Sequence, residues 1–254
     1  MTTMAILTAA GSGTRLGRDL PKALVELDGA ALVVHAARRL AASGVVDALV
    51  VTAPPGLVAA ISGLVGGDAA VTVPVRVVEG GHTRQQSVAA GLAAAGPETD
   101  VVLVHDAARP FASPELVRRV VAAVRAGHGA VVPGVPVVDT IKAVSAADQC
   151  AVGARDEVPT GANNVVEPVA STPERALLRA VQTPQGFDRA LLDRAHAAGA
   201  AHAANAPSTD DAGLVEALGE TVVVVPGEDA ALKITTERDL VLAALYADDG
   251  GTRP

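Results

Sequence analysis

This 254-residue sequence has few aromatic residues and a single cysteine, and its 20 basic residues are outnumbered by 28 acidic ones. Its aromatic side chains are Phe111, Phe187 and Tyr246, so the core must be built from the aliphatic residues that dominate the 50% apolar fraction. The single cysteine, Cys150, excludes an intramolecular disulfide and a metal site made of cysteines. A formal net charge of −8 argues against non-specific binding to nucleic-acid backbones.

Long hydrophobic runs are also missing. No apolar stretch reaches about 18 residues without a proline, a glycine or a charge, which is the length that a membrane-spanning helix needs. The opening "MTTMAILTAAG" has neither the basic start nor the long apolar segment of a signal peptide. We therefore expect a soluble, cytoplasmic protein with no membrane or nucleic-acid partner.

Short β-branched runs alternate with longer stretches rich in alanine and leucine. This alternation predicts an α/β fold, doubly wound around a mostly parallel sheet, and the continuous apolar runs "VVLVH" and "TVVVV" are typical of strands buried on both faces. The predicted strands are residues 5–8, 48–52, 71–78, 101–105, 130–133, 178–182 and 221–225. The predicted helices are residues 30–43, 57–65, 83–95, 113–126, 189–198, 209–218 and 236–246.

Several helix ends carry recognisable signals. Ser113 followed by Pro114 predicts an N-cap and a first-turn proline, and Ser208 with Asp211 resembles a capping box. Gly44 and Gly127 follow the last turns of two predicted helices.

One region breaks the alternation. The stretch 135–144, "VPVVDTIKAV", is extended in character, and a second apolar run follows at 177–181 after a polar segment rich in glycine, asparagine and proline. We predict a single domain, 1–254, from which residues 135–181 extend as a β-arm. Because an isolated two-stranded arm is marginally stable in water, we expect it to pack on a second copy of the chain in a homodimer. The alternative is a long surface loop.

A glycine-rich loop follows the first predicted strand, in "LTAAGSGTRLGRDLPKALVEL". It lacks the G-x-x-x-x-G-K-[ST] pattern of a P-loop, and Leu16 stands where a dinucleotide fingerprint needs its third glycine. Pro21 cannot continue a helix and favours an extended Leu20. The segment is therefore predicted to be an extended loop that wraps a ligand.

That loop has the groups needed to hold a triphosphate. Backbone N–H groups around Gly11 and Gly13 can form an anion-binding nest, since glycine adopts the required conformations. Arg15 adds a planar, bidentate guanidinium and Lys22 a compact ammonium. The alternative is a solvated loop with two ordinary surface cations.

A second group of candidates begins at "VLVHDAARP". Asp106 follows a buried strand at the sheet edge where α/β proteins bind ligands, so its carboxylate is a candidate for a ribose hydroxyl or a magnesium ion, unless it only caps a turn. Polar residues at other strand ends suggest a second phosphate site. Its candidate members are Arg109, Arg175, Lys233, Thr140 and Thr209. The histidines show no metal-ligand spacing, and no Ser-His-Asp arrangement is evident.

The motifs taken together are those of a known family. "AAGSGTRL…PKAL", "EGGHTRQQSVAAGL", "VLVHDAARP", "VVDTIKAV", "RAVQTPQGF", "TDDAGLVE" and "LKITTERDL" occur in an order and spacing that closely resembles 2-C-methyl-D-erythritol 4-phosphate cytidylyltransferases. The resemblance covers about residues 5–246. It implies a nucleotidyltransferase fold that dimerises through a β-arm. It also implies transfer of CMP from CTP to methylerythritol phosphate, with pyrophosphate released and Mg²⁺ or another divalent cation present.

The resemblance also implies roles for individual residues. Arg15 and Lys22 match the residues that stabilise the transition state on the CTP phosphates, and Arg175 and Lys233 match the pair that positions methylerythritol phosphate. The matches around the nucleotide and the second substrate are Ala9, Ala10, Gly81 and Ser87 near cytosine, Asp106 and Ala107 near ribose, and Thr140 and Arg109 near the second phosphate. Two alternatives stay open: a cytidylyltransferase for another polyol phosphate such as ribitol phosphate, and a non-catalytic nucleotide-binding module.

Overall fold

The computed structural model of the chain describes residues 1–11, 20–145, 167–201 and 209–248. It divides into two compact units, one made of Met1–Val135 with Val181–Pro254 and the other of Pro136–Ala180. No helix within these described ranges is long and apolar enough to cross a membrane.

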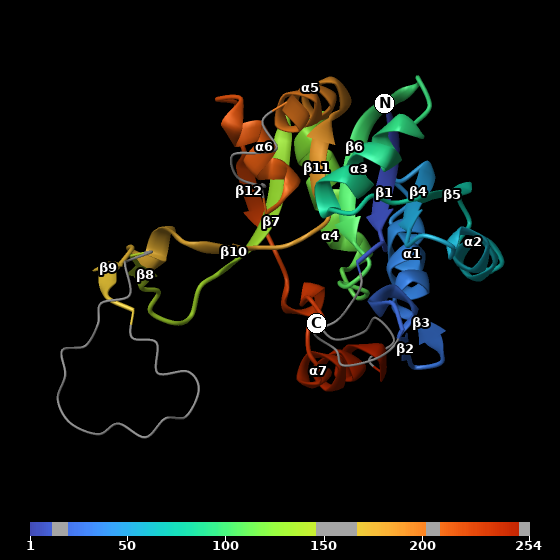
Figure 1. The fold of residues 1–254 in the computed structure, drawn as a ribbon, viewed down its shortest axis with the longest axis horizontal. Helices are drawn as coiled ribbons and strands as arrows, with labels where there is room; N and C mark the ends of the chain where they lie inside the picture. Colours follow the sequence, from blue (N-terminus) through green and yellow to red (C-terminus); the bar gives the residue numbers. More distant parts are fainter. Residues whose placement is uncertain (12–19, 146–166, 202–208, 249–254) are drawn as a thin grey trace. The chain divides into compact units, whose positions relative to one another are not determined.

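The larger unit is built on a mostly parallel sheet, as the sequence predicted (Figure 1). Across the sheet β5, β4, β1, β6, β11 and β7 follow one another, and both β10 (Arg179–Val181) and β12 pair with β7. Among the strand pairs whose register is described in this sheet, those of β11 with β6 and β7 are antiparallel and the others are parallel. The strands are β1 (Thr2–Thr8), β4 (Ala48–Ala53), β5 (Val75–Glu79), β6 (Thr99–Asp106), β7 (Ala130–Pro136), β11 (Gln185–Asp188) and β12 (Val223–Pro226).

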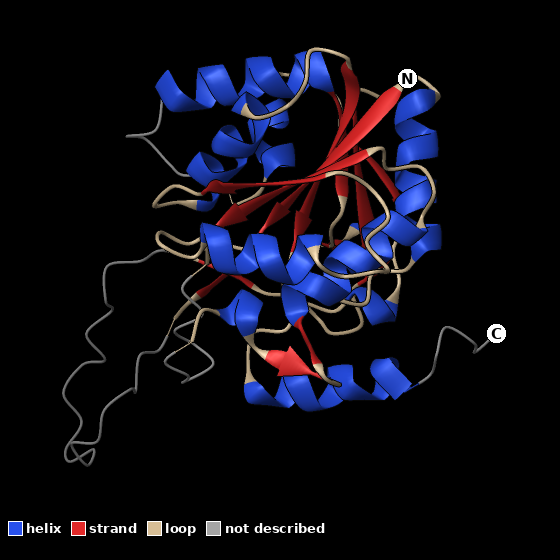
Figure 2. Ribbon diagram, turned by 90° about the vertical axis from the view of Figure 1, so that its right-hand side faces the viewer, coloured by secondary structure: helices blue, strands red, loops and turns tan. Residues whose placement is uncertain are grey.

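Helices cover both faces of this sheet (Figure 2). Alternate residues of β1 point to opposite faces, with Ala5 and Leu7 in one core cluster and Met4 and Ile6 in the other. Helices α1 (Leu32–Ala42), α2 (Val58–Gly66) and α4 (Pro114–Arg125) pack against the first cluster. Helices α3 (Arg84–Ala93), α5 (Arg189–Ala201) and α6 (Asp211–Ala217) pack against the second. The remaining α-helix, α7 (Glu237–Asp248), joins a smaller cluster around Phe111 and Ile234.

Most predicted helix ends are confirmed. The Ser113 hydroxyl accepts a hydrogen bond from the N–H of Leu116 at 3.1 Å, and Pro114 is the first residue of α4. Gly44 and Gly127 have φ of 68° and 103°, values that disfavour residues with a Cβ. The predicted capping box of α6 is wrong, because Asp210 is the N-cap and accepts from the N–H of Gly213, while Ser208 lies outside the described residues.

Two small elements were not predicted. Strand β11 is four residues long and contains Gly186, so it lacks the β-branched run that marks the other strands. A hairpin of β2 (Glu26–Leu27) and β3 (Ala30–Ala31) turns at Asp28 and Gly29, whose φ values of 48° and 73° suit a tight turn. The predicted strand 71–78 begins later, at Val75.

The smaller unit has a short antiparallel pair where the arm was expected. Strand β8 (Ala143–Val144) pairs with β9 (Val169–Ser171), and β10 (Arg179–Val181) follows a 3-10 turn at Arg175–Leu177. The side chain of Lys142 donates to the Thr172 hydroxyl at 2.8 Å, which links the two sides of the pair. Most of the predicted arm tip, residues 146–166, lies outside the described residues.

Candidate active site

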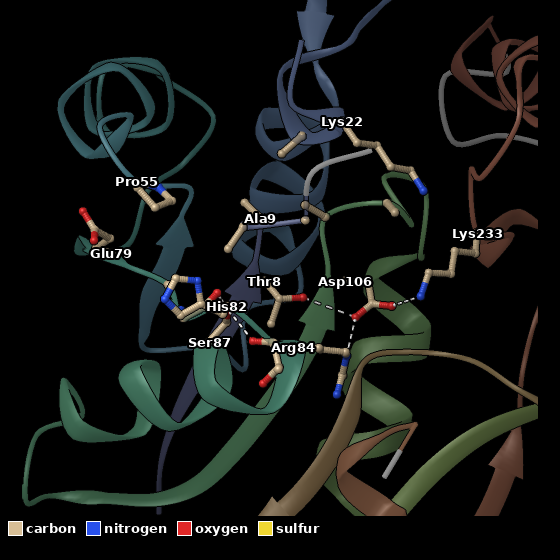
Figure 3. Close-up of a pocket in the computed structure, with 18 of the residues that line it drawn as sticks. Thr8, Ala9, Lys22, Pro55, Glu79, His82, Arg84, Ser87, Asp106 and Lys233 are labelled. Atoms are coloured by element: carbon tan, nitrogen blue, oxygen red, sulfur yellow. Dashed lines mark hydrogen bonds and ion pairs between the residues drawn. The ribbon is translucent and has the colours of Figure 1, made fainter. Parts of the chain in front are cut away.

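A cavity of about 580 Å³ opens at the carboxyl ends of the parallel strands (Figure 3). The chain runs from β1 outward through β4 and β5 and then returns to β6 on the other side of β1. This reversal of strand order is the place where open α/β sheets bind ligands. The cavity is lined by residues 8–11, 22–23, 79–84 and 106–108, together with Pro55, Ser87, Lys233 and Thr235.

The two described ends of the glycine-rich loop, residues 8–11 and 22–23, line one side of the cavity. The N–H of Ala9 donates to the Thr52 carbonyl at 2.9 Å, so the sheet hydrogen bonding continues one residue past β1. Pro21 is extended, with ψ of 133°, and a single 3-10 turn, η2 (Lys22–Leu24), follows it. Lys22 lines the cavity as predicted, whereas Arg15 and Gly13 lie in residues 12–19, outside the described part of the chain.

The opposite wall is the turn between β5 and α3. Ser87 is buried, and its hydroxyl accepts from the N–H of Gly81 at 3.1 Å and contacts the Thr83 carbonyl at 3.0 Å. Thr83 and Gln86 form a capping box at the start of α3. A Cβ on Gly80 would lie 2.6 Å from the Cβ of Ala10, so the two walls approach closely only because this position is glycine.

Asp106 lies between two cations on the cavity floor. Its carboxylate is 2.7 Å from Lys233 Nζ and 3.2 Å from Arg84 Nε, and the Thr8 hydroxyl is 3.3 Å from Oδ1. Burial alone would raise the pKa of Asp106, but the charges of Arg84 and Lys233 outweigh burial and hold that pKa well below its usual range.

In the view of Figure 3 the two lysines extend from the right of the cavity, and Pro55, Glu79 and His82 lie at its left.

Arg84 is the functional candidate that sequence reasoning missed. Its side chain joins two carboxylates, Asp106 at 3.2 Å and Asp211 at 2.6 Å. Burial alone would lower the pKa of Arg84, but these two charges raise it. The sequence does place Arg84 in "EGGHTRQQS", directly after the residue that caps a helix and close to the end of a strand. Nothing in the sequence, however, indicated that its partner would be Asp211, 127 residues away.

His105 connects two of the signature motifs, "HDAARP" and "TPQGF". The Thr183 hydroxyl accepts from the N–H of Asp106 at 3.1 Å and lies 3.0 Å from His105 Nδ1. The Arg109 carbonyl, 3.1 Å from His105 Nε2, can only accept, so Nε2 carries the ring hydrogen. Nδ1 is then the acceptor, and the Thr183 hydroxyl donates to it. Burial lowers the pKa of His105 to about 4.

We expect His105 to stay neutral down to a pH near 4, whereas an exposed histidine titrates near 6.5. Because the folded pKa is below the unfolded one, unfolding takes up a proton between these values. This contribution to the free energy of unfolding is complete above pH 6.5 and is lost as the pH falls toward 4. An NMR titration of the His105 ring would measure the midpoint, and a midpoint near 6.5 would contradict the buried, neutral assignment.

The other predicted phosphate ligands are placed differently. Arg109 does not line the cavity: its guanidinium donates to the backbone carbonyls of Ala231 at 2.6 Å and Val181 at 3.3 Å. Thr209 is exposed and is not among the lining residues. Thr140 and Arg175 belong to the smaller unit, where Arg175 donates to the Val138 carbonyl at 2.7 Å. The cavity therefore brings together Ala9, Ala10, Gly11, Lys22, Gly81, Ser87, Asp106, Ala107 and Lys233.

Comparison with known proteins identifies the family. The family model "IspD: 2-C-methyl-D-erythritol 4-phosphate cytidylyltransferase" matches residues 3–249. A protein of that name from Streptomyces coelicolor is 49% identical over 95% of this chain and 83% of its own length. One from Rhodococcus jostii is 46% identical over 97% and 96%.

A solved structure of the same name agrees. It comes from Thermus thermophilus, has a TM-score of 0.70 and 36% identity, and is matched over 96% of this chain and 98% of its own. The family model spans nearly the whole chain, and the sequence and structural matches support it. The chain therefore belongs to the 2-C-methyl-D-erythritol 4-phosphate cytidylyltransferase family.

Proposed function

We propose that this protein transfers CMP from CTP to 2-C-methyl-D-erythritol 4-phosphate. The products are 4-diphosphocytidyl-2-C-methyl-D-erythritol and pyrophosphate, and the reaction serves isoprenoid precursor synthesis by the non-mevalonate route. Family membership supports this assignment, and the observation that carries it is the cavity itself. Lys22 and Lys233 line it, and Asp106 lies between Lys233 and Arg84 at the switch point of the sheet.

The chemistry needs cations more than it needs a general base. A phosphate monoester has a second pKa near 6, so the acceptor oxygen is largely ionised at neutral pH. This oxygen forms a bond to the α-phosphorus of CTP while the bond from that phosphorus to the β-phosphate oxygen breaks, and pyrophosphate leaves with the electron pair. Bringing two polyanions together and stabilising the developing charge are the main tasks.

The described residues suit these tasks. Lys22, with Arg15 as its proposed partner, would contact the triphosphate, and Lys233, with Arg175, would position the acceptor phosphate. The backbone around Ala9, Ala10, Gly11 and Gly81, with Ser87 holding Gly81, would surround the nucleotide. Arg109, Thr140 and Thr209 remain proposed contributors on the acceptor side, and Ala107 on the ribose side.

The site offers one carboxylate, that of Asp106, as a ligand for a divalent cation such as Mg²⁺. Among the described residues no three His, Cys, Asp or Glu side chains gather as a metal site, so the protein would supply few ligands. Mg²⁺ is commonly held by one or two carboxylates together with substrate phosphates, and Asp106 is the proposed carboxylate. When bound, the ion would neutralise phosphate charge.

We further propose that the protein is a cytoplasmic homodimer. Val144 in β8 and Val169 in β9 are 44% and 56% exposed, and Val138 and Leu177 elsewhere in the smaller unit are 79% and 77% exposed. A short two-stranded pair with exposed apolar side chains is stabilised by packing on another surface. A second copy of the chain is the partner that the family resemblance implies.

A panel of acceptors tests the reaction. With CTP and Mg²⁺, the purified protein is expected to release pyrophosphate when methylerythritol phosphate is the acceptor. With ribitol phosphate we expect a kcat/KM at least about tenfold lower, because losing even a few specific contacts to a substrate costs about that much. Preference for ribitol phosphate would favour the alternative acceptor. CTP binding without turnover on any acceptor would contradict the assignment as an enzyme.

A further inference from the structure

A chain of ion-paired and hydrogen-bonded side chains extends from the cavity floor into the protein. It runs from Lys233 and Asp106 through Arg84 to Asp211 and then His196. The Asp211 side chain is 1% exposed and that of His196 is 6% exposed, and neither residue lines the cavity. Among the described contacts of the Asp211 side chain, the one with Arg84 leads to the cavity.

Asp211 holds Arg84 by one edge of its guanidinium. Arg84 Nη1 donates to Asp211 Oδ2 at 2.6 Å, while Nε donates to Asp106 Oδ1 at 3.2 Å. A guanidinium is planar, so fixing Nη1 on one carboxylate also fixes the direction in which Nε points. The shorter contact is the one behind the cavity wall, which makes Asp211 the anchor of this side chain.

Asp211 is itself fixed from two sides. Its second oxygen, Oδ1, accepts from His196 Nε2 on α5 at 2.9 Å. Gln185 on β11 accepts from the N–H of Ala212 at 3.3 Å and donates to Asp210 at 2.7 Å, which ties the start of α6 to the sheet. The anchor thus belongs to the packed core rather than to a surface loop.

We infer that Asp211 is a positioning residue, which sets the guanidinium of Arg84 and through it the carboxylate of Asp106. The inference deepens the proposed function and rests on it for its effect on turnover. Asp106 needs a fixed orientation because Lys233, a proposed contact of the acceptor phosphate, is paired with its other oxygen. Small displacements of such groups reduce the rate strongly, by as much as about 10²-fold for 1 Å.

The first test replaces Asp211→Asn, which keeps the shape and removes the charge. We expect kcat to fall by about 10- to 100-fold with the KM for CTP changed less than about threefold. Asp68→Asn is the matched control, because Asp68 likewise pairs with an arginine, accepting from Nε and Nη2 of Arg38 away from the cavity. Its kcat should stay within about twofold of the unmodified enzyme. An Asp211→Asn enzyme with unchanged kcat would overturn the inference.

A double-mutant cycle separates positioning from a general structural effect. In an Arg84→Gln background the Asp211→Asn change should lower kcat by less than about twofold further, because the inferred effect of Asp211 on the cavity passes through Arg84. Equal effects of Asp211→Asn in both backgrounds would overturn the inference. Arg84→Lys is a second variant that keeps the cation but loses the planar fork, and it should lower kcat at least about tenfold.

A measurement without substrates keeps this test independent of the proposed reaction. Arginine ¹⁵N NMR should show a slowly exchanging Nε–H of Arg84, assigned by its loss in Arg84→Gln, and its exchange should be about tenfold faster in Asp211→Asn. An unchanged exchange rate would overturn the positioning role. If the unmodified protein turned over no acceptor, the proposed function would fail while this measurement still decided how Arg84 is held.

Discussion

Replacing Lys22 with alanine is expected to lower kcat by about 10²- to 10³-fold, the loss seen when one preorganised charge donor is removed from a transition state. Lys22 begins the 3-10 turn that closes the glycine-rich loop, and its side chain lines the cavity. The sequence has three lysines, and two of them, Lys22 and Lys233, line this one cavity of an acidic protein. Charge that develops on the leaving pyrophosphate would meet a fixed ammonium there.

The measurement is steady-state pyrophosphate release with both substrates saturating. Arg194→Ala is a suitable control, because Arg194 is an exposed cation that pairs with Glu220 outside the cavity. Its kcat should stay within about twofold of the unmodified enzyme. A Lys22→Ala enzyme within about threefold of the unmodified rate would contradict the role of Lys22. Arg15→Ala carries the same expectation from the sequence.

The fold was predictable because its signals are local. The strand ending at Asp106 and the helix that Ser113 caps each show in a short window of sequence as apolar continuity or as a capping residue. Strand β11 was missed because its four residues carry little strand propensity and their position depends on pairing with β6 and β7. Tertiary contacts, rather than local preference, place this strand.

The site was predictable only in part, for the same reason. Lys22, Asp106 and Lys233 belong to recognisable motifs, and all three line the cavity. Their pairing is not local: Lys233 meets Asp106, and Arg84 meets Asp211, across more than a hundred residues of sequence. Nothing in one sequence distinguishes a cation that faces the ligand from one that holds a carboxylate. That distinction came from the geometry, and it turned Arg84 and Asp211 from unassigned residues into candidates.

Asp106→Asn is expected to lower kcat by about 10²-fold or more, since it removes the negative charge that lies between Arg84 and Lys233 on the cavity floor. The asparagine keeps the shape of the side chain, but Arg84 and Lys233 bind different oxygens of Asp106, so the amide NH2 group would face one of these two cations. Repulsion between these cations would then shift Lys233, whose side chain is 41% exposed, toward the solvent. If Asp106 is a Mg²⁺ ligand, the Mg²⁺ concentration that gives half-maximal activity should also rise in this variant.

Stability and activity should separate in this variant. Arg84 keeps Asp211 as a partner and Lys233 becomes hydrated, so we expect the free energy of unfolding to fall by only about 1–3 kcal/mol in urea denaturation. The pKa of Asp106 is lower in the folded protein than in the unfolded chain, so its ionised carboxylate stabilises the fold at neutral pH. This stabilisation is lost as the pH falls toward the folded pKa. In Asp106→Asn the free energy of unfolding should therefore change less with pH over the acidic range. Asp193→Asn, which breaks a partly exposed pair with Arg189 outside the cavity, should change neither quantity appreciably. A folded Asp106→Asn enzyme with kcat within about threefold of the unmodified value would show that the floor carboxylate is structural, and the acceptor phosphate would then have to be positioned by the cations alone.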